Sequence, residues 1–587
     1  MTTSRHRIAR IADLPGDGPH PASVGGRDLV LLRTDGQLRA FDGLCPHQGA
    51  LLGEGELEGG VLVCRNHRWR FDPRTGARIG GPQCLRSYPV HEHEGHVEIE
   101  LPDTAGEPAP TTKASSQRVF AELPGPRPLP LVGNALQLDT RRVHVTFEAW
   151  AREHGPFYRV VLGRRAFAVV SDPTLIAEIL RKRPESYRRM SRMADIFDEM
   201  GVDGVFSAEG TSWRPQRKLA MGALDHRHLT AFFSTLHDVA ERLRRRWETA
   251  ADAGDVLDVQ EEMMRFTVDV TTRLAFSEPT DVIGGASSQL LDDLDPLFPT
   301  IARRINAMFP YWRYLQLPRD RHFTRSLGRV RKWLEDVIAR TRERLQADPS
   351  RAEHPSDFVE AMLVARDPEG RPFSDRLLFG NALTMLVAGE DTTANTMAWA
   401  VHFLLDAPEE LSALRTRIDA VLGSARVPAD MATTRALDEI EAVANETMRL
   451  EPVAPMMFLE TIPEVTLGDV RLPAATPILV LTRPSALDPA RIDDPHAFRP
   501  ERWRDGHTAA ALQRAGVFVP FGSGPRICPG RSLALLEIRM VLATLLRNFE
   551  LERVGRSQDV GEELGFTLSP TNLRARLRRR SDAPAPA

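Results

Sequence analysis

Two short segments near the N-terminus each carry one cysteine and one histidine, and together they could bind a metal. Cys45-Pro-His47 is followed, after sixteen intervening residues, by Cys64-Arg-Asn-His67. Two thiolates and two imidazoles could hold zinc tetrahedrally. They could also hold a [2Fe–2S] cluster, with the cysteines on one iron and the histidines on the other. Zinc fingers usually pair like ligands within one knuckle, whereas each segment here supplies one of each kind, so the spacing favours the cluster.

The sequence around both segments resembles the Rieske ferredoxin family. The stretches FDGLCPHQGALLGEG and VLVCRNHRWRFDPRTGARIGGP follow the family's pattern, and the resemblance covers residues 1–101. It implies a small all-β domain whose [2Fe–2S] cluster is held by Cys45, His47, Cys64 and His67. Arg68 departs from the pattern, because the family usually has glycine there, and it places a bulky cation beside a cluster ligand.

Another cysteine and three histidines in this region receive no metal-binding role. Cys84 has no partner in its domain, so we expect an inert or buried thiol. His91, His93 and His96 lie in HEHEGH, on a predicted hairpin at 88–101 that turns at Glu94-Gly95. Alternation of polar residues is typical of a solvated strand face, so we interpret these histidines as solvated.

The fourth cysteine, Cys528, lies between a β-type run, GVFVP, and a strongly apolar helical segment, RSLALLEIRMVLATLL. A cysteine at a helix N-terminus meets the positive end of the dipole and free N–H groups, which lower its pKa and stabilise a thiolate. Neighbouring glycines let the backbone fold tightly around the sulfur. A thiolate held in this way suits an axial haem ligand.

A long predicted helix, 373–404, contains an unusual centre, Ala388-Gly389-Glu390-Asp391-Thr392-Thr393. A glycine within a helix costs about 1 kcal/mol relative to alanine, and an acid beside two β-branched alcohols adds to that cost. A helix that tolerates such residues usually gains function from them. The structural alternative is a kinked helix whose hydroxyls bond to the preceding turn.

From about residue 120 to 577 the chain resembles the cytochrome P450 family. The loop from Phe521 to Gly530 matches the family's F-x-x-G-x-R-x-C-x-G pattern, and the centre of the long helix matches A-G-x-D/E-T. The resemblance implies that Cys528 ligates the iron of haem b. The residues that it implies in haem binding are Trp213, Arg217, Ala388, Gly389, Phe521, Arg526, Cys528 and Gly530. The family often has a further propionate-binding arginine near Leu459, and this sequence has none there.

The same resemblance assigns roles around the haem. Asp391 and Thr392 are the expected catalytic pair: Thr392 bonds the oxygen being activated, and Asp391 relays protons from solvent. Gly389 is expected to leave room for oxygen. Glu446-Thr-Met-Arg449 matches E-x-x-R, and Arg502 completes a buried triad that we interpret as scaffold, because such triads are costly to break at one member.

The substrate wall is inferred from family position. Four segments are expected to face the substrate, and they are 190–206, 300–315, Met456-Met457-Phe458 and Phe566-Thr567-Leu568. Most of their residues are apolar, which favours an apolar substrate of moderate size. Equally, they could be ordinary core.

These motifs require two very different sets of elements to position them. Short strand patterns dominate residues 1–101, with runs at Leu29 to Leu32 and Val61 to Val63. Helical spacing dominates 119–577, where 157–163 and 166–170 are strand candidates; the predicted helices are 141–154, 173–182, 227–250, 257–275, 323–346, 373–404, 408–422, 436–450 and 531–547. The expected fold is therefore a small all-β domain followed by a large, mainly α domain with minor β structure.

A polar, proline-containing linker is predicted between the two domains at 102–118, and a disordered tail at 578–587. The 17 linker residues reach about 55–60 Å when fully extended, and roughly 20–25 Å as a flexible coil.

Composition excludes several classes of protein. Four cysteines in 587 residues exclude a disulfide scaffold. A net charge of −4 gives no electrostatic case for nucleic acid. No apolar run is long enough for a membrane span, and the N-terminus lacks the apolar region of a secretory signal, so we expect a cytoplasmic protein.

Together the two centres predict a monooxygenase fused to its electron donor, with O2 and an apolar molecule as substrates. No G-x-G-x-x-G follows a strand, so a separate NAD(P)H-dependent ferredoxin reductase is expected to feed the cluster. A Rieske ring-hydroxylating oxygenase is disfavoured, since no D-x-x-H-x4-H run follows residue 102. Two alternatives stay open: a peroxide-using or rearranging P450 with a regulatory Rieske domain, and a redox sensor without catalysis. The Asp391–Thr392 pair argues against both.

Overall fold

The structure is a computed structural model in which two compact units are formed. The first comprises residues 1–117 and 505–516, and the second 118–504 and 517–587. The described residues are 3–11, 14, 18–24, 27–46, 51–64, 69–81, 83–102, 118–139, 142–285, 288–294, 296–307, 309–353, 355–366, 370–504 and 508–580. Most of the predicted linker and the end of the predicted tail lie outside them.

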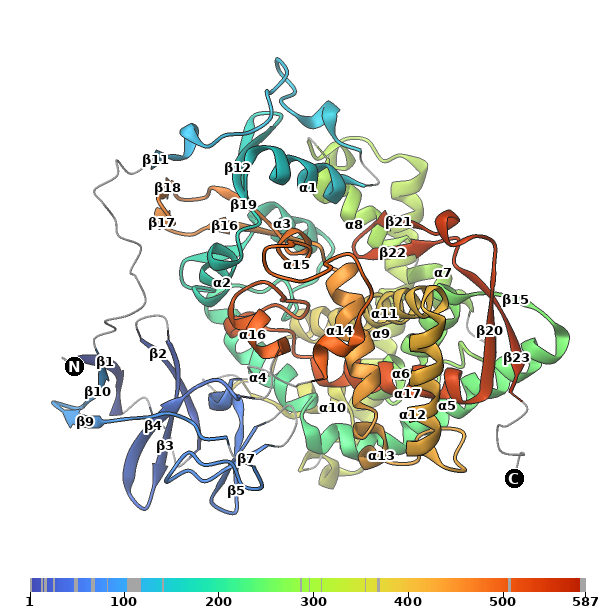
Figure 1. The fold of residues 1–587 in the computed structure, drawn as a ribbon, viewed down its shortest axis with the longest axis horizontal. Helices are drawn as coiled ribbons and strands as arrows, with labels where there is room; N and C mark the ends of the chain where they lie inside the picture. Colours follow the sequence, from blue (N-terminus) through green and yellow to red (C-terminus); the bar gives the residue numbers. More distant parts are fainter. Residues whose placement is uncertain are drawn as a thin grey trace. The chain divides into compact units, whose positions relative to one another are not determined.

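Strands make up most of the first unit, and Figure 1 draws its N-terminal part in blue. They form three antiparallel sheets, in the orders β1-β10-β9, β2-β3-β4-β8 and β5-β6-β7. The strands are β1 (Thr3–Arg10), β2 (His20–Val24), β3 (Arg27–Thr34), β4 (Gln37–Asp42), β5 (Glu56–Glu58), β6 (Val61–Val63), β7 (Arg70–Phe71), β8 (Ser87–Tyr88), β9 (Val90–His93) and β10 (His96–Pro102). The short helix α16 (Thr508–Arg514) falls in the range grouped with this unit.

Strand β3 lies between two apolar clusters of the first unit. Because successive strand side chains point to opposite faces, Val30 and Leu32 enter one cluster while Leu29 and Leu31 enter the other. All four side chains are fully buried. The continuous apolar run that predicted this strand is therefore explained by burial on both faces.

The predicted hairpin at 88–101 is confirmed as β9 and β10. His93 pairs with His96, and the two intervening residues, Glu94 and Gly95, both have positive φ (48° and 75°). A two-residue turn with both φ angles positive matches the twist of the flanking strands.

Several small sheets surround the helices of the second unit. Their orders are β12-β13-β19-β16-β14, β11-β18-β17, β15-β23-β20 and β21-β22. The strands are β11 (Arg118–Val119), β12 (Phe157–Leu162), β13 (Arg165–Val170), β14 (Tyr187–Arg189), β15 (Val256–Asp258), β16 (Met456–Thr461), β17 (Val465–Leu467), β18 (Val470–Leu472), β19 (Pro477–Leu481), β20 (Phe549–Val554), β21 (Gly561–Leu564), β22 (Leu568–Thr571) and β23 (Arg574–Arg579).

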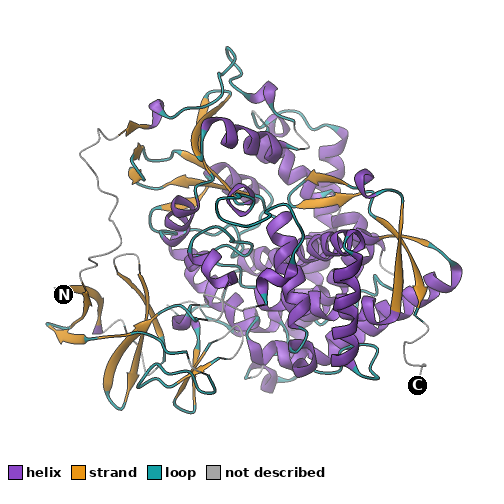
Figure 2. Ribbon diagram, in the orientation of Figure 1, coloured by secondary structure: helices purple, strands orange, loops and turns teal. Residues whose placement is uncertain are grey.

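Helices form the bulk of the second unit, as Figure 2 shows in purple. They are α1 (Val143–His154), α2 (Pro173–Arg181), α3 (Ser191–Glu199), α4 (Trp213–Ala223), α5 (His226–Ala253), α6 (Val259–Phe276), α7 (Ser288–Leu294), α8 (Leu297–Asn306), α9 (Pro318–Ala347), α10 (Phe358–Val364), α11 (Asp375–Asp406), α12 (Pro408–Leu422), α13 (Met431–Arg435), α14 (Asp438–Leu450), α15 (Arg483–Ala486) and α17 (Arg531–Asn548). Every range predicted to be helical overlaps one of these helices, so the predicted fold class is confirmed.

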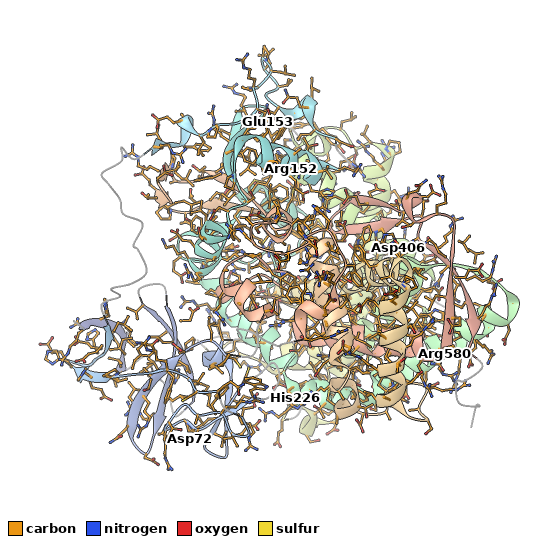
Figure 3. The ribbon with its side chains drawn as sticks, in the orientation of Figure 1. Asp72, Arg152, Glu153, His226, Asp406 and Arg580 are labelled. Atoms are coloured by element: carbon orange, nitrogen blue, oxygen red, sulfur yellow. The ribbon has the colours of Figure 1, made fainter. Side chains whose placement is uncertain are left out.

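Helix α11 is the central element of the second unit. It packs against α6, α9, α14 and α17, and Figure 1 shows it among them. Its first turn begins at Ser374, whose Oγ accepts a hydrogen bond from the Leu377 N–H (3.4 Å). Its last residue, Asp406, labelled in Figure 3, accepts one from Arg553 Nη2 of β20 (2.8 Å). Among the described helices, none combines the length and the apolar character needed to cross a membrane.

Candidate functional site

The two cysteines of the first metal-binding pattern lie in one apolar cluster of the first unit. Cys45 and Cys64 are each 1% exposed and pack with Leu52, Leu62 and Phe71. Side chains that far apart in the sequence share a core only because β4 and β6 bring their loops together. The two cysteines therefore lie in one buried cluster, and their binding of a shared iron stays a prediction.

Backbone pairing closes the base of each cysteine loop. Leu44 and Leu51 form an isolated antiparallel bridge around the first loop, and the Cys64 N–H donates to Trp69 O (2.8 Å) across the second. The predicted ligands His47 and His67, like Arg68, lie outside the described residues, so their ligand roles stay predictions.

Cys84 is exposed, so of the two expectations, an inert or a buried thiol, burial is wrong, and inertness stays a prediction. It pairs with Ala77 in an isolated β-bridge, and no other part of the described fold buries its side chain. His91 and His93 are partly to well exposed on β9, and His91 Nε2 lies 2.9 Å from Glu100 Oε1. These contacts are those of a solvated strand face, as predicted.

In the second unit, the loop before Cys528 is tightly folded. The Cys528 N–H donates to Phe521 O (2.8 Å), and Gly522 and Gly524 have positive φ (73° and 68°). A Cβ on Gly524 would lie 2.5 Å from Leu180 O, so only glycine fits between the loop and α2. Gly530 then begins α17 and places Cys528 just before the first helical turn.

Electrostatics around the Cys528 thiol differ from the expectation. Burial raises its pKa above the usual value, although the N–H groups of Gly530 and Arg531 and the cations Arg217 and Arg531 act in the opposite direction. The helix terminus alone therefore does not secure the thiolate. A cation bound at the sulfur would complete its ionisation.

Three arginines, Arg183, Arg189 and Arg526, lie around a single carboxylate, Glu209, with Arg217 near Arg526, and we call this set the arginine cluster. Its members are Arg183, Arg189, Arg217, Arg526 and Glu209. Arg526 Nη2 bonds Glu209 Oε2 and donates to Ala208 O (2.7 Å), while its guanidinium lies 4.2 Å from the centre of the Trp213 ring. Arg183 Nη2 is 3.8 Å from Glu209 Oε1. The cluster joins α4, β14 and the Cys528 loop, and the expected propionate contacts of Trp213 and Arg526 stay predictions.

The arginine cluster carries more positive charge than Glu209 offsets. Burial lowers the pKa of Arg526 to about 10, and burial with the nearby cations Arg183 and Arg526 holds the pKa of Arg189 well below its usual value. Among the described residues, Arg183 Nε and Nη2 and Arg526 Nε are buried without a hydrogen-bond partner. Buried cations with unused donors require an anion.

Arg189 is a site residue that motif comparison missed. It lies on β14 directly opposite Leu459 of β16, the region where the expected arginine is absent. Directly opposite residues share one face of a sheet, so the neighbouring strand supplies the guanidinium. Its Nε donates to Phe206 O (2.6 Å). No local signal could have found it, because the β14–β16 pairing joins segments about 270 residues apart in the sequence.

The E-x-x-R pair is fully buried on α14. Arg449 Nε and Nη2 donate to the two oxygens of Glu446 (2.9 and 2.8 Å), and both residues are 0% exposed. Arg502 Nε and Trp503 Nε1 also donate to Glu446 (3.3 and 2.9 Å). Arg449 uses its remaining donors on carbonyl groups of the 486–497 segment. The contacts are those of a scaffold.

Arg449→Ala is expected to lower the free energy of unfolding by about 3–5 kcal/mol, because it leaves the Glu446 carboxylate buried and short of donors. Arg556→Ala is the matched control, since Arg556 and Asp559 form an exposed ion pair at the same i,i+3 spacing. Urea denaturation followed by circular dichroism measures both. Equal midpoints in the two variants would contradict a scaffold role for the buried pair.

Helix α11 presents its unusual central residues in different directions. Thr392 Oγ1 donates to Ala388 O (3.1 Å), and Ala388 is exposed although most of α11 is buried. Gly389 packs against α6, because a Cβ there would lie 2.4 Å from Thr271 Oγ1. The glycine therefore permits close helix packing, and its expected role in leaving room for oxygen stays a prediction.

Asp391 points to the hairpin formed by β21 and β22. One of its oxygens accepts a hydrogen bond from Thr567 Oγ1, and the other accepts one from Asn395 Nδ2 (2.8 Å). Burial raises the pKa of Asp391 above its usual value, against the opposing effect of these two donors. The acid is thus half-buried and held by neutral groups.

Haem fits the residues present. Cys528 is exposed, although desolvation by the surrounding protein raises its pKa. Ala388 is an exposed residue in the middle of a mostly buried helix that packs on α17, whose start Cys528 precedes. The arginine cluster supplies donors for two carboxylates, as a haem with two propionates has. A thiolate, an apolar helix face and a cationic rim match the three parts of that group.

A cysteine in a tight loop before a helix is the arrangement expected of a haem-thiolate oxygenase. The chain belongs to the cytochrome P450 family, since the family model "Cytochrome P450" matches residues 123–576. The model "Rieske [2Fe-2S] domain" matches residues 4–89. The protein is a cytochrome P450 monooxygenase with an N-terminal Rieske domain, and its cofactors are haem and a [2Fe–2S] cluster.

Relatives in the P450 part are distant. "Protein LUTEIN DEFICIENT 5, chloroplastic" of Arabidopsis thaliana is 26% identical over 431 residues, 71% of each chain. "Carotene epsilon-monooxygenase, chloroplastic" of Arabidopsis thaliana is 26% identical over 433 residues, 72% of this chain and 79% of that protein. "Bifunctional cytochrome P450/NADPH--P450 reductase" of Aspergillus oryzae is 26% identical over 480 residues, 78% of this chain and 42% of that protein.

The expected substrate wall lies on four elements of the second unit. Residues 190–206 include α3, and 300–315 include the end of α8. Along β16, Met456 and Phe458 pack into one apolar cluster while Met457 packs into another. Leu568 is fully buried and donates its N–H to Val453 O (2.9 Å). Part of the predicted wall is thus core.

Proposed function

We propose that this protein inserts one oxygen atom from O2 into an apolar organic molecule, using electrons that pass from a separate NAD(P)H-dependent ferredoxin reductase through the Rieske cluster to the haem. The observation that carries the proposal is the presence, in one chain, of a one-electron centre and an oxygenase site with its acid–alcohol pair, Asp391 and Thr392. An electron carrier or sensor would not need that pair.

The fusion supports electron transfer within one chain. A linker of the predicted length would give the donor an effective concentration on the order of mM if it behaves as a short flexible chain. The similar protein of Aspergillus oryzae, by its name, joins a P450 to its reductase. We infer that here too an electron donor and a P450 are joined in one chain, and that the donor is a Rieske domain instead of a reductase.

Residues of the second unit have distinct parts in the proposed reaction. The haem, when bound, supplies the iron at which O2 is activated. Cys528 would ligate it, while Trp213, Arg217, Arg526 and Arg189 would hold its propionates. Thr392, anchored on Ala388 O, presents a hydroxyl at the exposed face of α11. Asp391, whose pKa burial raises, would supply the protons that O–O cleavage consumes.

Phe521 and Gly530 would contact the thiolate side. Gly530 lies beside the ligand, since a Cβ there would be 3.8 Å from Cys528 Sγ, and Phe521 O accepts the Cys528 N–H (2.8 Å). The largely apolar wall along α3 and α8 favours an apolar substrate.

A turnover assay with reductase alone tests the electron route. Purified full-length protein, a ferredoxin reductase, NADPH and a panel of apolar compounds are expected to give product without added ferredoxin. Cys64→Ala should lower that rate to background, because one iron loses a thiolate ligand. Dithionite-reduced Cys64→Ala should still form the CO complex of the haem, which shows that the second unit is intact.

Two results would replace this proposal. Equal turnover by Cys64→Ala would assign the Rieske domain a regulatory role. Product formation with hydrogen peroxide alone, at a rate above that with reductase, would favour the peroxide-using alternative.

A further inference from the structure

A three-residue turn places Thr567 beside the catalytic acid. Gly565, Phe566 and Thr567 connect β21 to β22, and the Gly565 N–H donates to Thr567 O (3.0 Å). Thr567 is 4% exposed, and its hydroxyl donates to Asp391 of α11. The turn and the acid are 176 residues apart in the sequence.

The side-chain hydrogen bonds described between α11 and this hairpin come from one face of the helix. Asp391, Asn395 and Trp399 are four residues apart, so they lie on the same side of the helix. Asn395 Nδ2 donates to Thr567 Oγ1 (3.0 Å) as well as to Asp391, and Trp399 Nε1 donates to Leu568 O (3.3 Å). Three successive turns of the helix therefore bond to two adjacent residues of the hairpin.

The hydroxyl group of Thr392 lies on a different side of α11 from the Asp391 carboxylate. Consecutive helical residues are about 100° apart around the axis, and Thr392 bonds to Ala388 on the exposed face. Asp391 faces the hairpin, where both of its oxygens are engaged. In this arrangement the acid must leave Thr567 before it can reach the side of the helix where Thr392 lies.

The neighbouring residue in the turn contacts the expected substrate wall. The Phe566 ring lies 6.0 Å from the Phe206 ring, centre to centre, and packs against the apolar cluster that contains α3 and α8 residues. Phe206 in turn lies 5.6 Å from Phe197 and 3.6 Å from the Arg189 guanidinium. A ligand that enters this wall would displace Phe566, and the turn is too short for Thr567 to stay in place.

We propose that Thr567 is a positioning residue that holds Asp391 away from the oxygen site until a ligand moves Phe566. The proposal rests on the role of Asp391 proposed above. Once released, the Asp391 carboxyl gives its proton to the Thr392 oxygen, the Thr392 hydroxyl proton passes to the oxygen site, and solvent returns one proton to Asp391. The hydrogen bond from Thr567 to Asp391 thereby limits the reduction of O2 without product formation when no substrate is bound.

The first experiment measures NADPH oxidation by full-length protein with ferredoxin reductase and no substrate. Thr567→Val is expected to raise this rate about tenfold, because a hydrogen bond to a carboxylate biases its position by at least that factor. Thr567→Ser, which retains the hydroxyl, should oxidise NADPH as the wild type does. Thr571→Val, the same substitution at the other end of β22, is the control and should also match the wild type.

A double variant separates this role from a merely structural one. In Thr567→Val/Asp391→Asn the increase should disappear, because the effect acts through Asp391. An unchanged or lower rate in Thr567→Val, or an increase that persists in the double variant, would overturn the proposal. Failure of the electron route is distinct, since wild type would then oxidise no NADPH until a free ferredoxin is added.

A second measurement needs no turnover. Amide hydrogen exchange over 561–571 should quicken when 4-phenylimidazole binds, since its phenyl group extends into the substrate space. Imidazole, which lacks that group, should leave the exchange unchanged. Equal exchange with both ligands would overturn the link between Phe566 and Thr567.

Discussion

Cys528→Ala is expected to abolish both oxygenation and the red-shifted Soret band that thiolate-ligated haem gives with CO after reduction. The reason is electronic: the thiolate is the ligand whose electron donation favours O–O cleavage, and alanine offers no lone pair. Difference spectra of the reduced protein with CO, and product formation with reductase, measure the two losses.

Cys84→Ala is the matched control for this prediction. It removes the same atom from an exposed thiol in the other unit, so the spectrum and the turnover should both be unchanged. Should Cys528→Ala retain the thiolate band, another residue would have to be the axial ligand, and the placement of Cys528 before α17 would need another explanation.

Asp391→Asn is expected to lower product formation by about 10²–10⁴-fold, the usual contribution of a positioned proton donor. Oxygen consumption should persist and appear as peroxide, because electrons still arrive and solvent supplies the two protons of H2O2, while Asp391 no longer delivers the proton that O–O cleavage needs. The ratio of product to NADPH consumed measures this uncoupling. Asp375→Asn, at the exposed start of the same helix, should keep the wild-type ratio.

The pH dependence adds a test with a definite sign. Burial raises the pKa of Asp391, so its carboxyl keeps its proton to a higher pH than an ordinary aspartate. Proton delivery should fall as the pH rises through that raised value. Asp391→Asn should lack this alkaline decline, and a decline of the same shape in the variant would assign it to another group.

Contiguous motifs made much of this protein predictable from its sequence. The Cys528 loop depends on glycines within a few residues of the sulfur, and the β9–β10 turn depends on Glu94-Gly95 alone. Local rules of backbone conformation act at that range. The family matches then agree with the division into a Rieske domain and a P450 domain.

Features that depend on distant contacts were not predictable in this way. Arg189 faces Leu459 only because β14 pairs with β16, and Asp391 bonds Thr567 only because the β21–β22 hairpin folds back on α11. Burial likewise determines side-chain pKa values that cannot be read from the sequence. The Cys528 pKa is raised although the helix terminus acts to lower it, because desolvation outweighs the N–H groups.

Because we propose that the arginine cluster around Glu209 binds the haem propionates, we expect haem loading to be a step of protein maturation. Some buried guanidinium N–H groups have no hydrogen-bond acceptor, so the positive charge of the cluster is not compensated until a dianionic ligand binds. A ligand that binds only the folded chain stabilises it by mass action. Under iron limitation, newly made chains would therefore accumulate in a form that proteases degrade, and haem supply would set the cellular abundance of this enzyme.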